Sequence, residues 1–334
     1  MNLDSLRSSL QQQLIEQANR LELNRDTIEL NYVLNWGGFV NASFTATDGR
    51  KTFHIKVSQS QESDESLRRW CKVHRPLEQK YHAPKLLLNI QMHETGREVI
   101  VFEQINGEPP MVLTRTLSNK ILSVLQRLHN DSGLAQEIDD ERSSQRSYAD
   151  CYKGTFHERF TEDLAIIQNN LPPFVDRTCF DWMKLQAEKL LQSVESSPAF
   201  QKTTGHLAHG DLWLNNILVD GDENFWILDW DDLSISDPAL DIVMLLGPSI
   251  EEIRPFEITK QDVPEYPLDE SMEERLKIYA PARLLDWIID PLADYVEAES
   301  APEVAAEVRI RNQHFHTLAR AAFESRYNNA PRFN

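Results

Sequence analysis

The pattern of hydrophobic and polar positions divides the chain into a first part with short strands and a second part that is mainly helical. Between Leu3 and Leu21, leucines recur at three- and four-residue spacing in a polar background, which is typical of an amphipathic helix lying on another element. Three short strands follow, and Asp48-Gly49 predicts a tight hairpin turn between the last two. The strands are predicted at 29–36, 40–46 and 52–57.

The first part continues with one helix and a second hairpin. The charged segment 63–79 carries a helical stripe of hydrophobic residues, and Pro76 predicts an interruption of this helix. The strands of the hairpin are predicted at 85–92 and 98–105. The following residues, 106–110, read Asn-Gly-Glu-Pro-Pro and indicate a linker.

Beyond the linker the hydrophobic spacing is helical almost throughout, and the only clear strands lie in the central stretch 206–232. A helix is also expected to begin at Asp237-Pro238, with Asp237 as its cap. The other helices are predicted at 117–130, 147–170, 180–195, 273–297 and 302–327.

This arrangement predicts an α+β fold with two lobes. A chain of 334 residues exceeds the size at which a single core usually stops growing. We expect an N-terminal lobe at 1–105, which contains an antiparallel five-stranded sheet with one helix and also the N-terminal helix. A mainly helical C-terminal lobe is expected at 106–334.

Composition and charge exclude several classes of partner. A hydrophobic content of 41% and a charged content of 26% are ordinary for a globular protein with a packed interior. The net charge of −19 disfavours binding to nucleic acid. No uncharged apolar run is long enough to span a membrane, and the first residues lack the pattern of a secretory signal. The three cysteines lie far apart without metal-ligand spacing. We therefore expect a cytoplasmic protein that binds neither nucleic acid nor membrane.

The central stretch carries the residues that predict chemistry. Asp211 and Asn216 are five residues apart, and Asp229 follows a short apolar strand. If Asn216 and Asp229 lie at the ends of neighbouring strands, their oxygens converge on one Mg²⁺, a cation that prefers oxygen ligands. Asp211 would then orient an acceptor hydroxyl and take its proton during phosphoryl transfer. The alternative is that carboxylates here only cap strands and turns, which is the interpretation we favour for Asp231, Asp232 and Asp237.

Two features of the predicted sheet fit a nucleotide. Gly37 and Gly38 join the first two strands in a chain with only 11 glycines. They form either a plain hairpin turn or a flap whose backbone amides cover phosphate oxygens. On the third strand, alternation places Lys56 on the side opposite Ile55 and Val57. A strand lysine is usually solvated, but one that follows a glycine flap is a candidate for pairing with phosphates.

A carboxylate on the next helix would hold such a lysine. Glu65 lies near the start of that helix and is the predicted partner of Lys56. Glu62 and Glu78 are the alternatives.

Three motifs, in order and spacing, resemble those of the aminoglycoside phosphotransferase and choline kinase superfamily, the small-molecule relatives of protein kinases. They are His-Gly-Asp211-Leu-Trp-Leu-Asn-Asn216, Ile-Leu-Asp229-Trp-Asp231 and Asp237-Pro-Ala-Leu-Asp241. The resemblance covers about 33–246 and implies a bilobal protein-kinase-like fold that binds ATP and Mg²⁺. It also implies that the backbone at Gln104 and Ile105 meets the adenine, and that Asp241 braces the catalytic region.

The acceptor is expected to be a small molecule. Only seven residues separate Asp229 from Asp237, too few for the activation and peptide-docking segments of a protein kinase. On the predicted last-but-one helix, carboxylates at four-residue spacing form one face, with Trp287 and Tyr295 nearby. Such a face either binds an ammonium or amino-sugar group or is simply solvated. The carboxylates are those of Asp286, Asp290 and Asp294.

The predicted function is transfer of the terminal phosphoryl group of ATP to a hydroxyl of a small molecule: an aminoglycoside, an amino alcohol or a sugar derivative. One alternative is a catalytically silent pseudokinase that binds nucleotide and regulates a partner. The other is a protein kinase. The sequence leaves open which acceptor is used, whether ATP or GTP is preferred, and the oligomeric state.

Overall fold

The structure is a computed structural model that describes residues 3–33, 40–138, 146–221, 224–246, 263, 266–298 and 305–328. The chain divides into two compact units. Unit 1 comprises Met1–Pro110 and Asn215–Leu233, and unit 2 comprises Met111–Leu214 and Ser234–Asn334. The segment Asn215–Leu233 thus makes its contacts with unit 1, although its position in the sequence is beyond the predicted linker. The predicted α+β fold, with a sheet-rich and a helical part, is confirmed.

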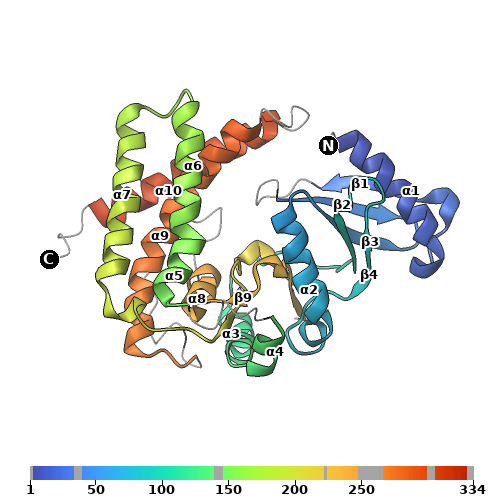
Figure 1. Ribbon diagram of the computed structural model, residues 1–334, viewed down its shortest axis with the longest axis horizontal. Helices are drawn as coiled ribbons and strands as arrows, with labels where there is room; N and C mark the ends of the chain where they lie inside the picture. Colours follow the sequence, from blue (N-terminus) through green and yellow to red (C-terminus); the bar gives the residue numbers. More distant parts are fainter. Residues whose placement is uncertain are drawn as a thin grey trace. The chain divides into compact units, whose positions relative to one another are not determined.

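Unit 1 is built on an antiparallel sheet with the strand order β1-β2-β3-β5-β4 (Figure 1). The turn between β2 and β3 is the predicted one, because Gly49 has a φ of 83° and the Asp48 carboxylate accepts hydrogen bonds from the N–H groups of Arg50 and Lys51. The strands are β1 (Glu29–Val33), β2 (Asn41–Thr47), β3 (Thr52–Ser58), β4 (Leu86–Gln91) and β5 (Glu98–Glu103).

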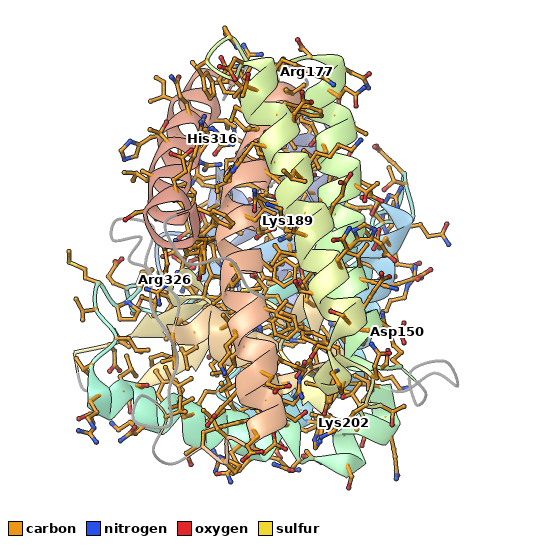
Figure 2. The ribbon with its side chains drawn as sticks, turned by 90° about the vertical axis from the view of Figure 1, so that its left-hand side faces the viewer. Asp150, Arg177, Lys189, Lys202, His316 and Arg326 are labelled. Carbon is orange, nitrogen blue, oxygen red and sulfur yellow. The ribbon has the colours of Figure 1, made fainter. Side chains whose placement is uncertain are left out.

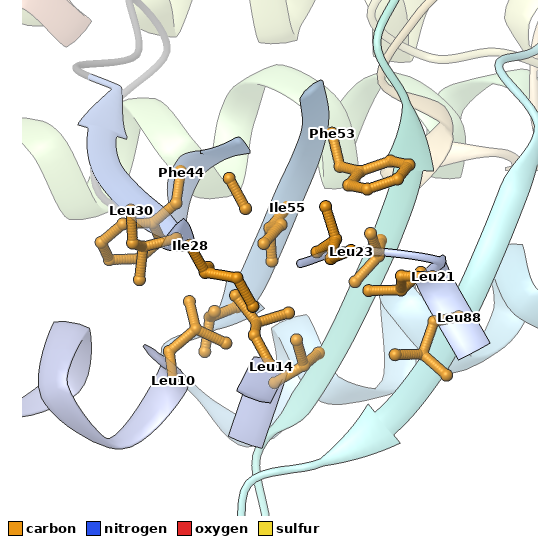
Figure 3. Packing of buried hydrophobic residues seen from close by; sticks show 14 of the residues in the cluster. Leu10, Leu14, Leu21, Leu23, Ile28, Leu30, Phe44, Phe53, Ile55 and Leu88 are labelled. Carbon is orange, nitrogen blue, oxygen red and sulfur yellow. The ribbon is translucent and has the colours of Figure 1, made fainter. Parts of the chain in front are cut away.

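One face of this sheet is covered by α1 (Leu3–Leu21), as the leucine spacing predicts (Figure 3). Leu10 and Leu14 of α1 are fully buried and belong to the same core as Phe44 and Ile55 of the sheet. The short helix η1 (Arg25–Thr27) connects α1 to β1. The burial of this apolar stripe is what holds α1 in unit 1.

The opposite face is covered by α2 (Gln61–Lys80), so that the sheet lies between α1 and α2 (Figure 1). Trp70 of α2 stacks on Phe102 of β5 with ring centroids 4.4 Å apart. The predicted interruption at Pro76 is wrong, because α2 continues through this residue to Lys80. Val73 and Leu77, on either side of Pro76, are completely buried, and their packing outweighs the missing backbone hydrogen bond.

The rest of unit 1 is a small hairpin of β7 (Ile217–Val219) and β8 (Phe225–Ile227), with Ile217 opposite Ile227. The short helices η5 (Leu214–Asn216) and η6 (Trp230–Asp232) flank the two strands. The hairpin is attached to the N-terminal part of the unit by backbone hydrogen bonds between Glu108 and Val219. These bonds explain why the hairpin belongs to unit 1.

In the residues that the structure describes, the regular elements of unit 2 are helices, apart from the two-residue strands β6 (Leu207–Ala208) and β9 (Ser234–Ile235), which pair with each other. The long helix α9 lies between α7 and α10 (Figure 2). The short helix α4 was not predicted. The helices are α3 (Arg115–His129), α4 (Ser132–Ile138), α5 (Tyr148–Tyr152), η3 (Lys153–His157), α6 (Glu158–Asn169), α7 (Arg177–Ser196), η4 (Pro198–Phe200), α8 (Pro238–Leu246), α9 (Glu270–Glu297), α10 (Ala305–Phe323) and η8 (Glu324–Asn328).

The start of α8 follows the prediction. The helix begins at Pro238, and the Asp237 carboxylate accepts a hydrogen bond from the N–H of Ala239. The same carboxylate also forms a buried ion pair with Arg275 of α9. Among the helices that the structure describes, none combines the length and the apolar character needed to cross a membrane.

Candidate active site

Lys56 is buried in the middle of β3, on the α2 side of the sheet. Ile55 and Val57 point into the α1 core, so alternation along the strand turns Lys56 the other way, as predicted. The side chain is 6% exposed, and Nζ lies 5.4 Å from the ring centroid of Trp70. A buried ammonium group requires carboxylate partners.

Two carboxylates from the segment after β8 supply this charge. Lys56 Nζ donates to Asp229 Oδ1 at 2.5 Å and to Asp231 Oδ2 at 2.9 Å. Burial alone would lower the pKa of Lys56, but the two carboxylates outweigh it, and the pKa lies above its usual value. The lysine is therefore a fixed positive charge.

The hairpin of β7 and β8 brings Asn216 to Asp229. Asn216 immediately precedes β7 and Asp229 follows β8, and the antiparallel pairing places both at the same end of the hairpin. The N–H of Leu228 donates to the carbonyl oxygen of Asn216 at 2.8 Å. Asp229 has a φ of 58°, a left-handed backbone conformation that few non-glycine residues adopt. The two residues therefore lie at the same end of the hairpin within unit 1, which is the arrangement that the predicted metal site requires.

Asp231 is held more tightly than a surface carboxylate. Asn41 Nδ2 of β2 donates to Asp231 Oδ2 at 2.6 Å, and Arg69 Nη2 of α2 donates to the backbone carbonyl of Asp231 at 2.7 Å. Burial raises the pKa of Asp231 to about 7, with Lys56 lowering it and Asp229 raising it. Asp231 is thus part of the lysine site, whereas the sequence favoured a purely structural role.

The donors in this corner of unit 1 suit Mg²⁺. Asp229 offers a carboxylate, Asn216 an amide oxygen, and both are hard oxygen ligands. Asp231 Oδ1 and Asn41 Oδ1 are buried and have no hydrogen-bond partner in the described part of the chain. Within the same residues, no group of three or more His, Cys, Asp or Glu side chains is arranged to hold a metal alone. The arrangement fits an ion that takes one or two protein ligands and completes its shell with phosphate oxygens and water.

In unit 2, Asp241 fixes the backbone of the loop that carries Asp211. The N–H groups of His209 and Gly210 donate to the Asp241 carboxylate at 2.8 Å and 2.9 Å. His129 Nε2 lies 2.8 Å from Asp241 Oδ2. Gly210 has a φ of 92°, a conformation that favours glycine, and it places the half-buried Asp211 directly after the turn. Asp241 therefore has the bracing position that the resemblance implies.

The structure agrees only in part with the predictions for the other residues expected to bind the nucleotide. Gly37 and Gly38 lie outside the described residues. Gln104 and Ile105 follow the last paired residue of β5, so their backbone N–H groups are not used in the sheet. The predicted ion pair between Glu65 and Lys56 is not formed, because Glu65 is exposed on the outer side of α2 and accepts from Gln61 Nε2 at 3.4 Å.

The alternatives to Glu65 are not at Lys56 either. Glu62 is exposed, and Glu78 accepts a hydrogen bond from the N–H of Leu86. The stripe of α2 that faces the sheet presents Trp70 to Lys56 instead of a carboxylate.

The carboxylates on the acidic face of α9 are not simply solvated, and they differ in their partners. Asp286 is buried and forms ion pairs with Arg159 of α6 and Arg283 of α9. Burial raises the pKa of Asp290 to about 6. The positive charges of Arg159 and Arg283 lower this pKa, and the negative charges of Asp286 and Asp211 raise it. Asp290 and Asp211, both in unit 2, are therefore close enough to interact electrostatically.

Two further carboxylates belong to this acidic group. Burial and the charge of Asp290 raise the pKa of Asp294 to about 7 and that of Asp163, on α6, to about 8. Asp163 was missed in the sequence because it lies on a different helix. Asn41 and Arg69 were missed because no local pattern links them to Asp231.

A comparison with models of protein families finds a match that covers most of the chain. The model of the phosphotransferase enzyme family matches residues 32–263, a range that includes Lys56, Asp211, Asn216 and Asp229. A comparison with curated proteins finds no match.

Solved structures with the same fold cover almost the whole chain. A choline kinase from Cryptosporidium parvum Iowa II is 14% identical, with 94% of this chain and 95% of that chain covered and a TM-score of 0.61. The microcompartment-associated aminopropanol kinase is 17% identical, with 93% and 97% covered and a TM-score of 0.59. A spectinomycin phosphotransferase, in complex with ADP and spectinomycin, is 16% identical, with 96% and 94% covered and a TM-score of 0.56. The likeness establishes a kinase-like fold, and the match to the family model, which covers more than half of the sequence, shows that the chain belongs to the phosphotransferase enzyme family.

Proposed function

We propose that this protein is an ATP- and Mg²⁺-dependent kinase that transfers the terminal phosphoryl group to a hydroxyl of a small molecule. The observation that carries the proposal is the buried Lys56 ammonium held against Asp229, with Asn216 at the same end of the β7–β8 hairpin. A fixed positive charge next to a pair of hard oxygen ligands is the chemistry that polyphosphate requires.

In this proposal the residues of unit 1 bind the nucleotide. Lys56 pairs with phosphate oxygens, Asn216 and Asp229 hold the metal, and the backbone at Gln104 and Ile105, which lies beyond the last paired residue of β5, meets the base. A bound Mg²⁺ would neutralise charge on the phosphates and orient the terminal group. Positioning and charge neutralisation supply most of the rate in phosphoryl transfer.

Asp211 orients the acceptor hydroxyl and takes its proton as the new bond to phosphorus forms. Asp241 fixes the backbone on which Asp211 is mounted through the N–H groups of His209 and Gly210. Because Asp241 is completely buried, it acts on the base through this backbone.

The acceptor in this proposal carries an ammonium group. Asp163, Asp290 and Asp294 have raised pKa values because they are buried near one another, and Asp290 also interacts with Asp211. A cationic ligand would relieve the repulsion among these carboxylates. The choline kinase and aminopropanol kinase among the similar folds are named for amino alcohols, which supports this class.

The test is a screen for acceptor-stimulated release of ADP from ATP in the presence of Mg²⁺. The panel contains amino alcohols, aminoglycosides, amino acids, neutral sugars and a peptide mixture. We expect stimulation by an amine-bearing small molecule and its loss when EDTA removes Mg²⁺. Stimulation only by peptides would indicate a protein kinase. Stabilisation by nucleotide without turnover on any acceptor would indicate a pseudokinase.

A further inference from the structure

The carboxylate that fixes Lys56 comes from an unexpected part of the chain. A helix next to a phosphate-binding lysine would be expected to supply the counter-charge, but α2 presents Trp70, and its Glu65 is exposed. Lys56 forms its ion pairs with Asp229 and Asp231, and both come from the segment after β8 instead.

These two carboxylates are not equivalent. The side chain of Asp229 is 37% exposed, whereas that of Asp231 is 13% exposed. Asp231 is also tied to β2 through Asn41 and to α2 through Arg69, which binds its backbone carbonyl. Asp231 is thus fixed by contacts with two different elements, and the side chain of Asp229 is the more accessible of the two.

The role of α2 follows from these contacts. Arg69 and Trp70 are adjacent on α2, and one holds the backbone of Asp231 while the other lies under the ammonium of Lys56. The helix therefore positions the carboxylate indirectly, without contributing one.

We propose that Asp231 is the positioning residue for Lys56, in place of a glutamate on α2, and that it thereby leaves Asp229 available to exchange the lysine for Mg²⁺. This inference rests on the proposed nucleotide site in unit 1. If Asp231 is replaced by a neutral residue, Asp229 remains as the single counter-charge of Lys56. Metal and lysine then compete for one carboxylate, and both metal and nucleotide bind less well.

The first test measures ATP binding by calorimetry, with Mg²⁺ and with EDTA, for the wild type and Asp231→Asn. We expect the variant to bind MgATP about tenfold more weakly or worse, because it loses a hydrogen bond to a charged group. It should also need a higher Mg²⁺ concentration for half-maximal binding. Asn41→Ala, which leaves the charges unchanged, should weaken MgATP binding in the same direction by about threefold.

Two control variants sharpen this test. Asp26→Asn changes an exposed aspartate in η1 and should bind MgATP as the wild type does. Glu65→Gln should also be unchanged. Wild-type affinity in Asp231→Asn, or an equal loss in Glu65→Gln, would overturn the proposal.

The second test does not depend on nucleotide. Thermal unfolding of Lys56→Met, Asp231→Asn and the double variant forms a double-mutant cycle. We expect the losses in melting temperature to be clearly non-additive, with little further loss from Asp231→Asn once Lys56 is gone. Additive losses would overturn the pairing. If the wild type binds no ATP, the proposed function fails, while the cycle still decides whether Asp231 holds Lys56.

Discussion

Asp241 is buried, yet its hydrogen bonds favour the charged form. Burial raises the pKa of this carboxyl, but His129 and the N–H of Gly210 lower it by more, and the pKa lies below its usual value. The contact with His129 links the loop at Asp211 to the end of α3. A single carboxylate therefore joins separate segments of unit 2.

Replacement of Asp241 by Asn should weaken the fold. The amide has one acceptor oxygen and presents an NH₂ group to at least one of the backbone donors at His209 and Gly210. We expect the free energy of unfolding to fall by about 3 kcal/mol, as is typical when one partner of a buried charged network is removed. Urea unfolding measures this loss, and a midpoint equal to that of the wild type would contradict the bracing role.

The pKa of Asp163 is shifted in the opposite direction to that of Asp241, and this shift makes the stability of the fold depend on pH. An aspartate in an unfolded chain titrates near pH ~3.9. In the folded protein, burial raises the pKa of Asp163 to about 8, and the negative charges of Asp290, Asp286 and Asp294 on α9 contribute to this rise. Arg159, on the same helix as Asp163, lowers the pKa but does not cancel the rise. Between these two pH values the folded state binds more protons than the unfolded state. Stability is therefore highest below the unfolded pKa and falls as pH rises to about 8.

Asp163→Asn should remove part of this pH dependence. The amide is neutral at every pH, so it avoids the penalty of a buried negative charge. At pH 8 we expect the free energy of unfolding to exceed that of the wild type by roughly 1–3 kcal/mol, and the difference should shrink as pH falls towards ~4. Melting temperatures recorded across this range measure it, and an equal difference at all pH values would refute the explanation.

At the scale of elements, the sheet of unit 1 depends on a helix on each face. The stripe of α1 that contains Leu10 and Leu14 completes the core on one side, and α2 with Trp70 covers the other. The side of the sheet on which Lys56 lies is therefore set by the register of β3 between two packed layers.

Leu14→Ala tests the importance of α1. Leu14 is fully buried, so its truncation removes apolar burial and leaves a cavity, and we expect a loss of about 2–5 kcal/mol in the free energy of unfolding. Gln12→Ala, on the exposed side of the same helix, is the matched control and should change stability by less than about 0.5 kcal/mol. Equal effects of the two substitutions would show that α1 is not part of the core.

For the whole molecule, features that follow from regular sequence patterns could be predicted, whereas contacts between residues far apart in the sequence could not. Leucine spacing gave α1, alternation gave the side of Lys56, and Asp48-Gly49 gave the β2–β3 turn. Pro76 was misread because a proline signals the loss of one hydrogen bond, whereas the packing of α2 decides whether the helix continues.

In the candidate active site, too, local sequence patterns predicted more than long-range contacts did. The spacing of Asn216 and Asp229 was enough to predict that they lie at adjacent strand ends, since a short hairpin joins them. The lysine's partners were not predictable, because Asp231 reaches Lys56 across 175 positions of sequence. The left-handed backbone of Asp229, which redirects this segment, leaves no signal in a residue other than glycine.

The central claim is that Asp211 takes the proton of the acceptor hydroxyl in a kinase that uses ATP. The most direct measurement is the single-turnover rate of phosphoryl transfer to the acceptor identified by the screen, at saturating MgATP, for the wild type and Asp211→Asn. We predict that the variant binds ATP as well as the wild type does and transfers the phosphoryl group about 10³-fold more slowly. A transfer rate within about twofold of the wild-type value would contradict the assignment of Asp211 as the base.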